Sequence, residues 1–360
     1  MATAPAIEKH RPWMVYGANG YTGRLCAIES VQRGMRPVLG GRNATALGEL
    51  ARELGLEFRV FTLDDPRVVA DNLGGITSVL HCAGPFSATS VPMLSACEHA
   101  HCHYFDITGE IDVFEYVHSR DAHWKRSGMV AMPGVGFDVV PSDCLAAMLK
   151  RALPDATRLR LAFQSRDGKF SPGTAKTVVE GLPKGSRIRK EGKLISVPSA
   201  SMTAMIPFRN SPELAVGIPW GDVSTAYYST GIPNIEVYTG VPEKQFKMMR
   251  RAAALRPILG LGFVQRFLKN RITKHVKGPT ESDRARNETL LWGEVTNDAG
   301  QKKALRMRTP EGYALTVDAA VTILQRVART PLPPGALTPS MAFGPDFVLE
   351  LQGVQVFEAE

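Results

Sequence analysis

Three glycines near the start of the chain have the spacing of a pyrophosphate-binding turn. Gly17, Gly20 and Gly23 follow the short apolar run 13–16 and stand where a helical pattern begins. Gly17 permits a tight strand-to-helix turn, Gly20 lets the backbone approach phosphate oxygens, and Gly23 lets the helix pack close to the strand. The first amides of that helix would then face the anion. The segment predicts a dinucleotide site.

The residues at the end of the next strand indicate which dinucleotide the site would bind. The run RPVLGGRN (36–43) reads as a strand ending about twenty residues past the last glycine, where an NAD enzyme carries an acidic residue for the ribose. Gly41, Arg42 and Asn43 stand there instead. A guanidinium binds a 2′-phosphate that a carboxylate would repel, so the sequence favours NADP over NAD. The alternative is that Arg42 is only a solvated residue at a helix start.

Hydride transfer often needs a proton donor beside the coenzyme, and acidic residues follow two later glycine-containing bends. Glu110 and Asp138 are our candidates for this role. The alternative is that these carboxylates cap helices or brace turns through backbone amides. Further candidates at strand ends or in the second region are Tyr104, Asp106, Asp143, Asp222 and Tyr228.

Alternating strand and helix signals place these residues in one sheet. Six apolar runs before residue 143 end in small or polar residues, which predicts a doubly wound parallel sheet of the Rossmann α/β class. Ligands of such sheets lie over the carboxyl ends of the strands. Asp64 or Asp65, at the end of the third strand, could hydrogen-bond adenine, or either could merely cap a helix.

The pattern changes after about Asp143. Alternation in 157–165 predicts a strand with one solvated face, and turn residues separate 224–229 from 234–240 and 290–296 from 303–309. We interpret these as antiparallel strand pairs, followed by a helix capped by Thr316. The second region is therefore expected to be α+β with a mostly antiparallel sheet. The expected domains are 1–143, 144–330 and a C-terminal segment 331–360.

Length and composition fit two buried cores. The 360 residues are 44% hydrophobic and 22% charged, and no apolar run has the length of a membrane span or a signal peptide core. We expect a cytoplasmic protein, a homodimer, with no nucleic acid as partner. Cys97, His101, Cys102 and His103 lack zinc-site spacing, so we expect no metal.

The net charge of +8 is unevenly placed. Between Lys244 and Thr280 there are Lys and Arg residues and no Asp or Glu. A basic amphipathic helix pair within 244–277 can lie on an anionic membrane or dock an acidic acyl-carrier protein. The alternative is two surface helices whose apolar sides complete the second core.

Several motifs taken in order resemble one known family. GANGYTG, GGRN, CAGPF, ACEHAHCHYFDITGE and PGVGFDVVPSD, with STGIPNIEVY, LLWGEV, GYALT and TPSMAFG downstream, are similar to the saccharopine dehydrogenase-like oxidoreductases, which include trans-acting enoyl reductases. The resemblance implies a Rossmann domain, an α+β substrate domain, a C-terminal segment returning to the first domain, and NADP chemistry. It does not imply saccharopine as the substrate.

Carried over by position, the resemblance assigns a coenzyme site. Arg42 and Asn43 would take the 2′-phosphate and the adenosine ribose. The residues expected along the pyrophosphate are Gly17, Asn19, Gly20, Tyr21, Thr22 and Gly23, and those beside the nicotinamide ribose are Ala83, Gly84, Pro85 and Phe86.

These features lead to an NADP(H)-dependent reductase as our first hypothesis. It would deliver hydride to a C=C, C=N or C=O bond of an apolar or acyl-linked small molecule. A non-catalytic NADP-binding or lipid-associated scaffold is the alternative. A saccharopine-type amino-acid dehydrogenase is a weaker one, since a dicarboxylate substrate would need several inward Arg residues.

Overall fold

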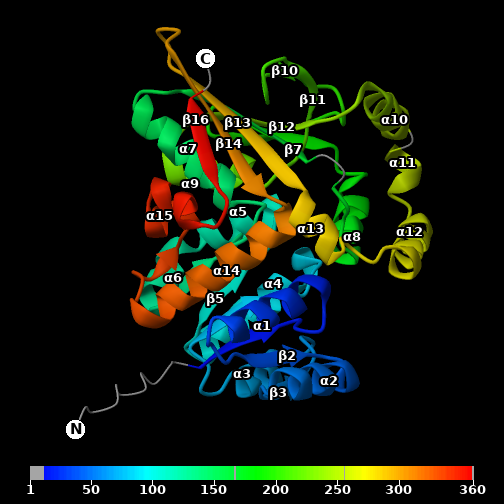
Figure 1. Cartoon of the computed structure of the whole chain (residues 1–360), viewed down its shortest axis with the longest axis vertical. Helices are drawn as coiled ribbons and strands as arrows, with labels where there is room; N and C mark the ends of the chain where they lie inside the picture. Colours follow the sequence, from blue (N-terminus) through cyan, green and yellow to red (C-terminus); the bar gives the residue numbers. More distant parts are fainter. Residues whose placement is uncertain (1–11, 166–167, 255, 359–360) are drawn as a thin grey trace.

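The computed structural model describes residues 12–165, 168–254 and 256–358. They form two sheets with helices packed around them (Figure 1). The first sheet has seven parallel strands in the order β15-β6-β5-β4-β1-β2-β3. Its strands are β1 (Trp13–Tyr16), β2 (Val38–Gly41), β3 (Phe58–Val60), β4 (Ser78–His81), β5 (His103–Asp106), β6 (Val130–Met132) and β15 (Gly335–Ala336).

Helices connect the first six strands. They are α1 (Tyr21–Gln32), α2 (Ala44–Leu54), α3 (Pro66–Asn72), α4 (Phe86–His99), α5 (Ile111–Ser119) and α6 (Asp121–Ser127), and α7 (Val140–Ala152) follows β6. The strand order reverses between β1 and β4, which in doubly wound sheets is the point where a ligand binds beyond the carboxyl ends. The predicted Rossmann domain is confirmed.

Both faces of this sheet are covered. Val15 of β1 packs in one core cluster, whereas its neighbours Met14 and Tyr16 pack in another, because successive side chains of a strand point to opposite faces. Asn43 caps the N-terminus of α2, and Gly55, in the left-handed conformation, ends this helix.

The second sheet is mixed. Its main path runs β10-β11-β12-β7-β13-β14-β16, with β8 and β9 attached to β12; β12 and β7 are parallel and the other pairs antiparallel. The strands are β7 (Arg158–Ser165), β8 (Ser186–Lys190), β9 (Lys193–Val197), β10 (Thr203–Ile206), β11 (Glu213–Gly217), β12 (Asn234–Gly240), β13 (Glu288–Thr296), β14 (Lys302–Pro310) and β16 (Gln355–Glu358). The predicted hairpin of 290–296 and 303–309 is confirmed as β13 and β14.

The remaining helices lie around the second sheet and between the two sheets. They are α8 (Pro172–Gly181), α9 (Asp222–Thr230), α10 (Glu243–Ala254), α11 (Arg256–Leu259), α12 (Gly262–His275), α13 (Glu281–Arg286), α14 (Gly312–Arg329), α15 (Pro339–Phe343) and a 3-10 turn (Pro345–Glu350). In the described part of the chain, no helix combines the length and apolarity that crossing a bilayer would require.

Two expectations for this region are wrong. Residues 224–229 are not a strand but part of α9, which buries its Val223 and Ala226 side chains and ends at Gly231 in the left-handed conformation. The helix expected to be capped by Thr316 begins earlier, at Gly312, because the Glu311 carboxylate accepts hydrogen bonds from the amides of Tyr313 and Ala314.

The chain passes between the two sheets more than once. α14 packs along α1 (Figure 1), with Arg33 bonded to Asp318 and Thr322. β15 then extends the first sheet beside β6, and β16 pairs with β14 in the second. The limits predicted for the three segments stay predictions.

Candidate functional site: a glycine turn and its surroundings

The β1–α1 turn requires glycine at two positions. Gly17 has φ +81°, and a Cβ there would lie 2.9 Å from the Ala83 Cβ. A Cβ on Gly23 would lie 2.3 Å from the Gly17 carbonyl oxygen. The turn is held to the next strand by the amides of Gly17 and Ala18, which both donate to the Gly40 oxygen, at 2.8 and 3.1 Å. The backbone geometry is therefore that of a phosphate-binding turn.

The N-terminus of α1 has no side-chain cap. Gly20 is its N-cap, no side chain accepts from its first amides, and its first turn contains no acidic residue. Asn19 and Gly20 are exposed, whereas Thr22 and Gly23 are buried. Uncapped amides at a helix N-terminus suit an anion, so this turn fits the diphosphate of a dinucleotide.

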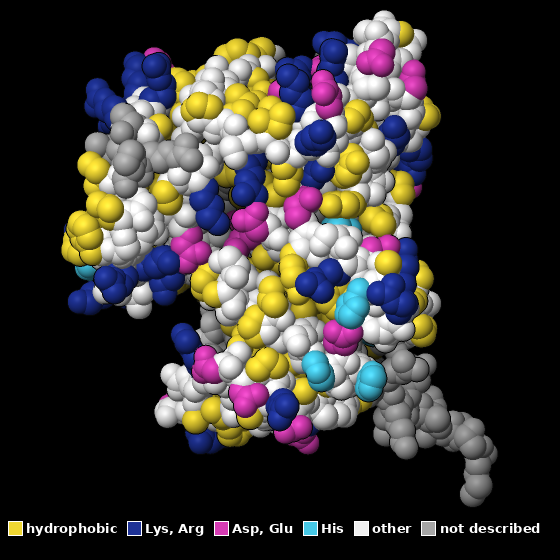
Figure 2. Space-filling view, turned by 180° about the vertical axis from the view of Figure 1, so that it is seen from behind, with side chains coloured by type: hydrophobic (Ala, Val, Ile, Leu, Met, Phe, Trp, Pro, Cys, Tyr) yellow, Lys and Arg dark blue, Asp and Glu magenta, His cyan; other side chains and the backbone are white. Residues whose placement is uncertain are grey.

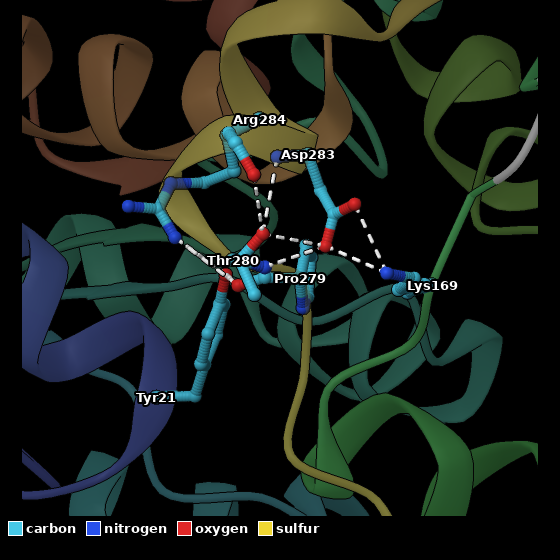
Figure 3. A network of polar contacts seen from close by, with 7 residues as sticks. Tyr21, Lys169, Pro279, Thr280, Asp283 and Arg284 are labelled. Atoms are coloured by element: carbon cyan, nitrogen blue, oxygen red, sulfur yellow. Dashed lines mark hydrogen bonds and ion pairs between the residues drawn. The ribbon is translucent and has the colours of Figure 1, made fainter.

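The Tyr21 side chain is bonded to the second domain. Its hydroxyl donates to the Pro279 oxygen at 2.7 Å and accepts from the Arg284 guanidinium at 2.9 Å (Figure 3). Arg284 lies on α13, whose capping box joins Thr280 and Asp283, and Lys169 bonds the Asp283 carboxylate. Because these bonds hold the Tyr21 side chain, the main-chain amide is the group of this residue that could bind an anion at the N-terminus of α1.

Arg42 follows β2 and its side chain is exposed. Burial raises the pKa of the nearby Tyr16 phenol to about 12; the charge of Arg42 opposes this rise and that of Asp64 adds to it. Arg42 follows β2 and Asp64 follows β3, so both lie at the edge of the sheet where an adenosine would lie in this fold.

Two neighbouring candidates are helix caps. The side-chain oxygen of Asn43 accepts from the Ala46 amide at 3.1 Å, and Asp65 accepts from the Arg67 amide at 2.9 Å. Asp64 is exposed and does not cap α3. Of the two acidic residues, Asp64 is the one better placed to bond adenine.

The loop after β4 is held by Glu110. Its two carboxylate oxygens accept from the amides of Phe86 and Ser87, at 2.9 and 2.8 Å, and so close the N-terminus of α4. Burial raises the pKa of Glu110, and the two amides oppose that rise. Ala83 of the same loop lies against Gly17, and Gly84 and Pro85 follow it. Glu110 therefore orders residues 83–86 beside the glycine turn.

Asp138 has a carboxyl group that titrates near neutrality. It is half-buried at the end of the loop after β6, against Gly109, where a Cβ would lie 2.7 Å from the Asp138 Oδ2. Burial, together with the charge of Glu110, raises the pKa of Asp138 to about 7. A carboxylic acid in this condition can hold a proton and release it.

Sequence reasoning missed the anchoring role of Asp106, which we considered only as a proton donor. Its buried carboxylate accepts from the Tyr104 hydroxyl at 2.6 Å and from the amides of Thr108 and Gly134, both at 2.9 Å. Burial raises the pKa of Asp106 to about 7. The residue joins the end of β5 to the loop that carries Asp138.

Tyr313 was also missed, although it lies in the GYALT motif. Its hydroxyl accepts from the Ser171 amide at 2.6 Å and lies 2.8 Å from the Thr174 hydroxyl. Its ring meets that of Tyr21 edge to face at 5.0 Å, and the charge of Asp138 acts on it. Tyr313 therefore lies between the glycine turn and Asp138, on the side of the second domain.

The other proton-donor candidates are fully buried or bonded to a neighbouring side chain. Asp143 and Asp222 are fully buried, and Asp143 accepts from the Ser340 amide at 2.8 Å. The Tyr228 hydroxyl donates to Glu115 at 3.1 Å. Among the described residues no three His, Cys, Asp or Glu side chains are grouped so that they could hold a metal ion.

Part of this chain is similar in sequence to known proteins. A trans-acting enoyl reductase of Mycobacterium leprae is 30% identical over 159 residues, 40% of this chain and 37% of that protein. A "probable mitochondrial saccharopine dehydrogenase-like oxidoreductase" of Arabidopsis thaliana is 24% identical over 206 residues, 49% of this chain and 44% of that protein. The chain thus matches less than half the length of these relatives. No family model matches it.

Among solved structures, apo saccharopine dehydrogenase (L-Glu forming) from Saccharomyces cerevisiae has the same fold. The TM-score is 0.63 at 8% sequence identity, and the match covers 96% of this chain and 100% of that one. These named relatives and the shared fold agree with the resemblance that the motifs indicated: the chain is similar in sequence to oxidoreductases of the saccharopine dehydrogenase-like and enoyl reductase kinds and has the fold of saccharopine dehydrogenase.

Proposed function

We propose that this protein is an NADP(H)-dependent oxidoreductase that transfers hydride to a C=C, C=N or C=O bond of an apolar or acyl-linked small molecule. The observation that carries the proposal is the uncapped N-terminus of α1 behind Gly17 and Gly20, with Arg42 beyond the next strand. The oxidoreductase names of the relatives support it.

The coenzyme half of the proposed site uses main-chain amides and one guanidinium. The first amides of α1 would bind the diphosphate, Arg42 would bind the 2′-phosphate, and Asp64 would bond the adenine amino group. When bound, the reduced nicotinamide supplies the hydride. Residues 83–86, ordered by Glu110, would lie beside its ribose.

The chemical half uses Asp138 as the proton donor. With a pKa of about 7, its carboxyl is protonated on the acid side of neutrality and can deliver a proton to the substrate atom that gains charge as hydride arrives. In this assignment Glu110 positions the loop, since both its oxygens accept backbone amides. Tyr313 would border the substrate from the second domain.

A saccharopine-type dehydrogenase is less favoured by the charges present. Arg189 is the arginine buried among the described residues, and its guanidinium bonds Glu115, the Val223 oxygen and the Gly192 oxygen. Each of its three nitrogens thus already donates to an oxygen of the protein itself. The yeast saccharopine dehydrogenase shares the fold, and at 8% identity its substrate does not transfer.

The test is an assay of NADPH oxidation in the presence of enoyl thioesters, imines and ketones. The reaction is measured as the loss of absorbance of the reduced nicotinamide. Wild type should oxidise NADPH with at least one class. D138N should bind NADPH as wild type does and lose on the order of 100-fold in kcat. Binding without oxidation by any substrate would favour the scaffold alternative, and absence of binding would refute the proposal.

The pH profile gives a second readout. The protonated Asp138 is the active form for reduction, so kcat should be highest below about pH 7 and should fall as pH rises through the raised pKa. D138N should lack this step. A wild-type kcat independent of pH across neutrality would remove Asp138 from the proton-donor role.

A further inference from the structure

We propose that α10 and α12 form a docking surface for an anionic phospholipid bilayer. We call it the basic arm: the exposed outer faces of Glu243–Ala254 and Gly262–His275. Apart from Glu243 at its first position, this stretch lies in the acid-free segment from Lys244 to Thr280. The inference does not depend on the proposed hydride transfer.

The inner faces of both helices pack on the second domain. Phe246 and Met249 of α10 pack against a cluster of Ala200, Val216 and Val241. On α12, Lys269 pairs with Glu180 of α8, and the Gln265 amide donates to the Val179 oxygen at 2.9 Å. These contacts agree with the alternative in which the apolar sides of the helices complete the core of the second domain. They also determine which faces of the helices point outward.

The outer face of α12 exposes aromatic rings. Phe263 and Phe267, one turn apart, are 65% and 59% exposed. Asn270 and Lys274 continue their stripe at helical spacing, and the exposed Arg266 and Arg271 flank it. Two neighbouring Phe rings in water cost free energy that immersion in the headgroup and acyl boundary would recover, while the flanking cations reach lipid phosphates.

α10 repeats this arrangement. Met248 is 64% exposed, and Lys244, Lys247 and Arg251 surround it on the outward face. Figure 2 shows the edge that carries the arm at its left side, with hydrophobic atoms between an upper and a lower group of Lys and Arg atoms. Each of the two helices thus exposes apolar side chains bordered by cations, which is the pattern of helices that lie on a membrane.

The cations themselves favour lipid over protein as the occupant. Lys is depleted from protein–protein interfaces, whereas the polar face of interfacial helices is rich in it. Lys244, Lys247, Lys274 and Lys277 are all exposed here. Four flexible ammonium groups around apolar side chains complement a plane of phosphates better than the fixed carboxylates of one acidic protein.

The segment that follows the arm contacts the residue at the start of α1, beside the glycine turn. Four residues after α12, the Pro279 carbonyl oxygen accepts a hydrogen bond from the Tyr21 hydroxyl (Figure 3). A Cβ on Gly278 would lie 2.8 Å from the Tyr21 Cε2, so the two residues are in close contact. Docking of the arm would therefore bring the glycine turn near the bilayer, where an apolar substrate dissolves.

The test is sedimentation with vesicles of phosphatidylglycerol and phosphatidylcholine, compared with phosphatidylcholine alone, at low and high salt. Wild type should bind the anionic vesicles and release in high salt. The triple variant R266Q, R271Q, K274Q should bind on the order of 100-fold more weakly. The double variant F263A, F267A should lose at least about tenfold.

The control variants remove three positive charges, or one exposed Phe ring, elsewhere on the molecule. R52Q, R67Q, R126Q removes three exposed arginines of the first domain, and F357A removes a Phe that is 48% exposed. Both should bind vesicles as wild type does, and the thermal midpoint of every variant shows that it is folded.

Three results would overturn the proposal. They are equal binding to neutral and anionic vesicles, equal loss in the control variants, and capture of an acyl-carrier protein through Phe263 and Phe267 with no vesicle binding. A change of molecular mass in F263A, F267A would instead assign the surface to a second copy of the chain. None of these readouts requires NADPH, so their failure is separate from failure of the proposed function.

Discussion

Two helix N-termini lie side by side at the carboxyl edge of the first sheet, because their strands β1 and β4 are paired. The amides that begin α1 have no side-chain acceptor, whereas those that begin α4 are occupied by the Glu110 carboxylate. One terminus has no side-chain acceptor and the other is closed by a carboxylate of the protein itself. In the function that we propose, the first terminus binds an external anion, whereas the second positions a loop.

The largest expected effect comes from filling the space that keeps the α1 terminus open. G23A places a Cβ 2.3 Å from the Gly17 oxygen, so the turn must shift, and we expect a loss of about 3 kcal/mol in the free energy of unfolding together with loss of NADPH binding. Urea denaturation and NADPH titration measure both.

The control is Gly34, which also lies at an end of α1. It has φ +77°, and nothing lies within 4 Å of the position that a Cβ would take. G34A should therefore cost about 1 kcal/mol through backbone strain alone and leave NADPH affinity unchanged. Equal effects of the two variants would contradict the special role of the turn.

Opening the α4 terminus is the converse change. E110A removes the acceptor of the Phe86 and Ser87 amides, and we expect unfolding to become easier by about 2 kcal/mol. E110Q keeps one acceptor oxygen and should lose about half of that. The measurement is chemical denaturation; an E110A protein as stable as wild type would show that the cap contributes nothing.

A third variant tests the proposed contact with the 2′-phosphate separately from the contact with the diphosphate. R42D should weaken NADPH binding by at least ~1.5 kcal/mol and spare NADH, because it replaces an attraction to the extra phosphate with a repulsion. Titration calorimetry with both coenzymes measures this. R126D makes the same charge change on α6 and should leave both affinities as they are; unchanged NADPH affinity in R42D would mean that the preference is misassigned.

The smallest effect concerns Tyr21, which borders the open terminus. Y21F removes a hydroxyl bonded to Pro279 and Arg284, so we expect a loss of about 1 kcal/mol in thermal or urea stability. NADPH affinity should stay within about twofold, since the proposed phosphate contact is with the main chain. A tenfold weaker NADPH complex would assign the hydroxyl to the coenzyme instead.

Local signals in the sequence predicted much of the fold. The alternation of strands and helices in the first sheet and the hairpin of β13 and β14 depend on neighbours in the chain. The prediction failed at 224–229, where a short mixed run fits a strand or a helix and packing decides. It also placed the cap of α14 at Thr316 instead of Glu311, because several polar residues there can accept amides.

The candidate site divides in the same way. The glycine turn and Arg42 could be found because their conformation and place follow from a strand and the helix after it. The role of Asp106 in holding the loop and the place of Tyr313 beside Tyr21 could not be found from the sequence. Their hydrogen-bond partners, Gly134 and Ser171, lie far from them in the chain.

The sequence by itself determined the open α1 terminus: glycines at 17, 20 and 23 impose a turn without side chains, and a cation stands at residue 42 where a carboxylate would select NAD. Only the tertiary structure decided that Glu110 closes α4, that burial raises the pKa of Asp138 to about 7, and that the Phe rings of α12 face outward. Backbone conformation is set within a few residues, whereas burial and hydrogen-bond partners are set by segments that meet only when the chain has folded.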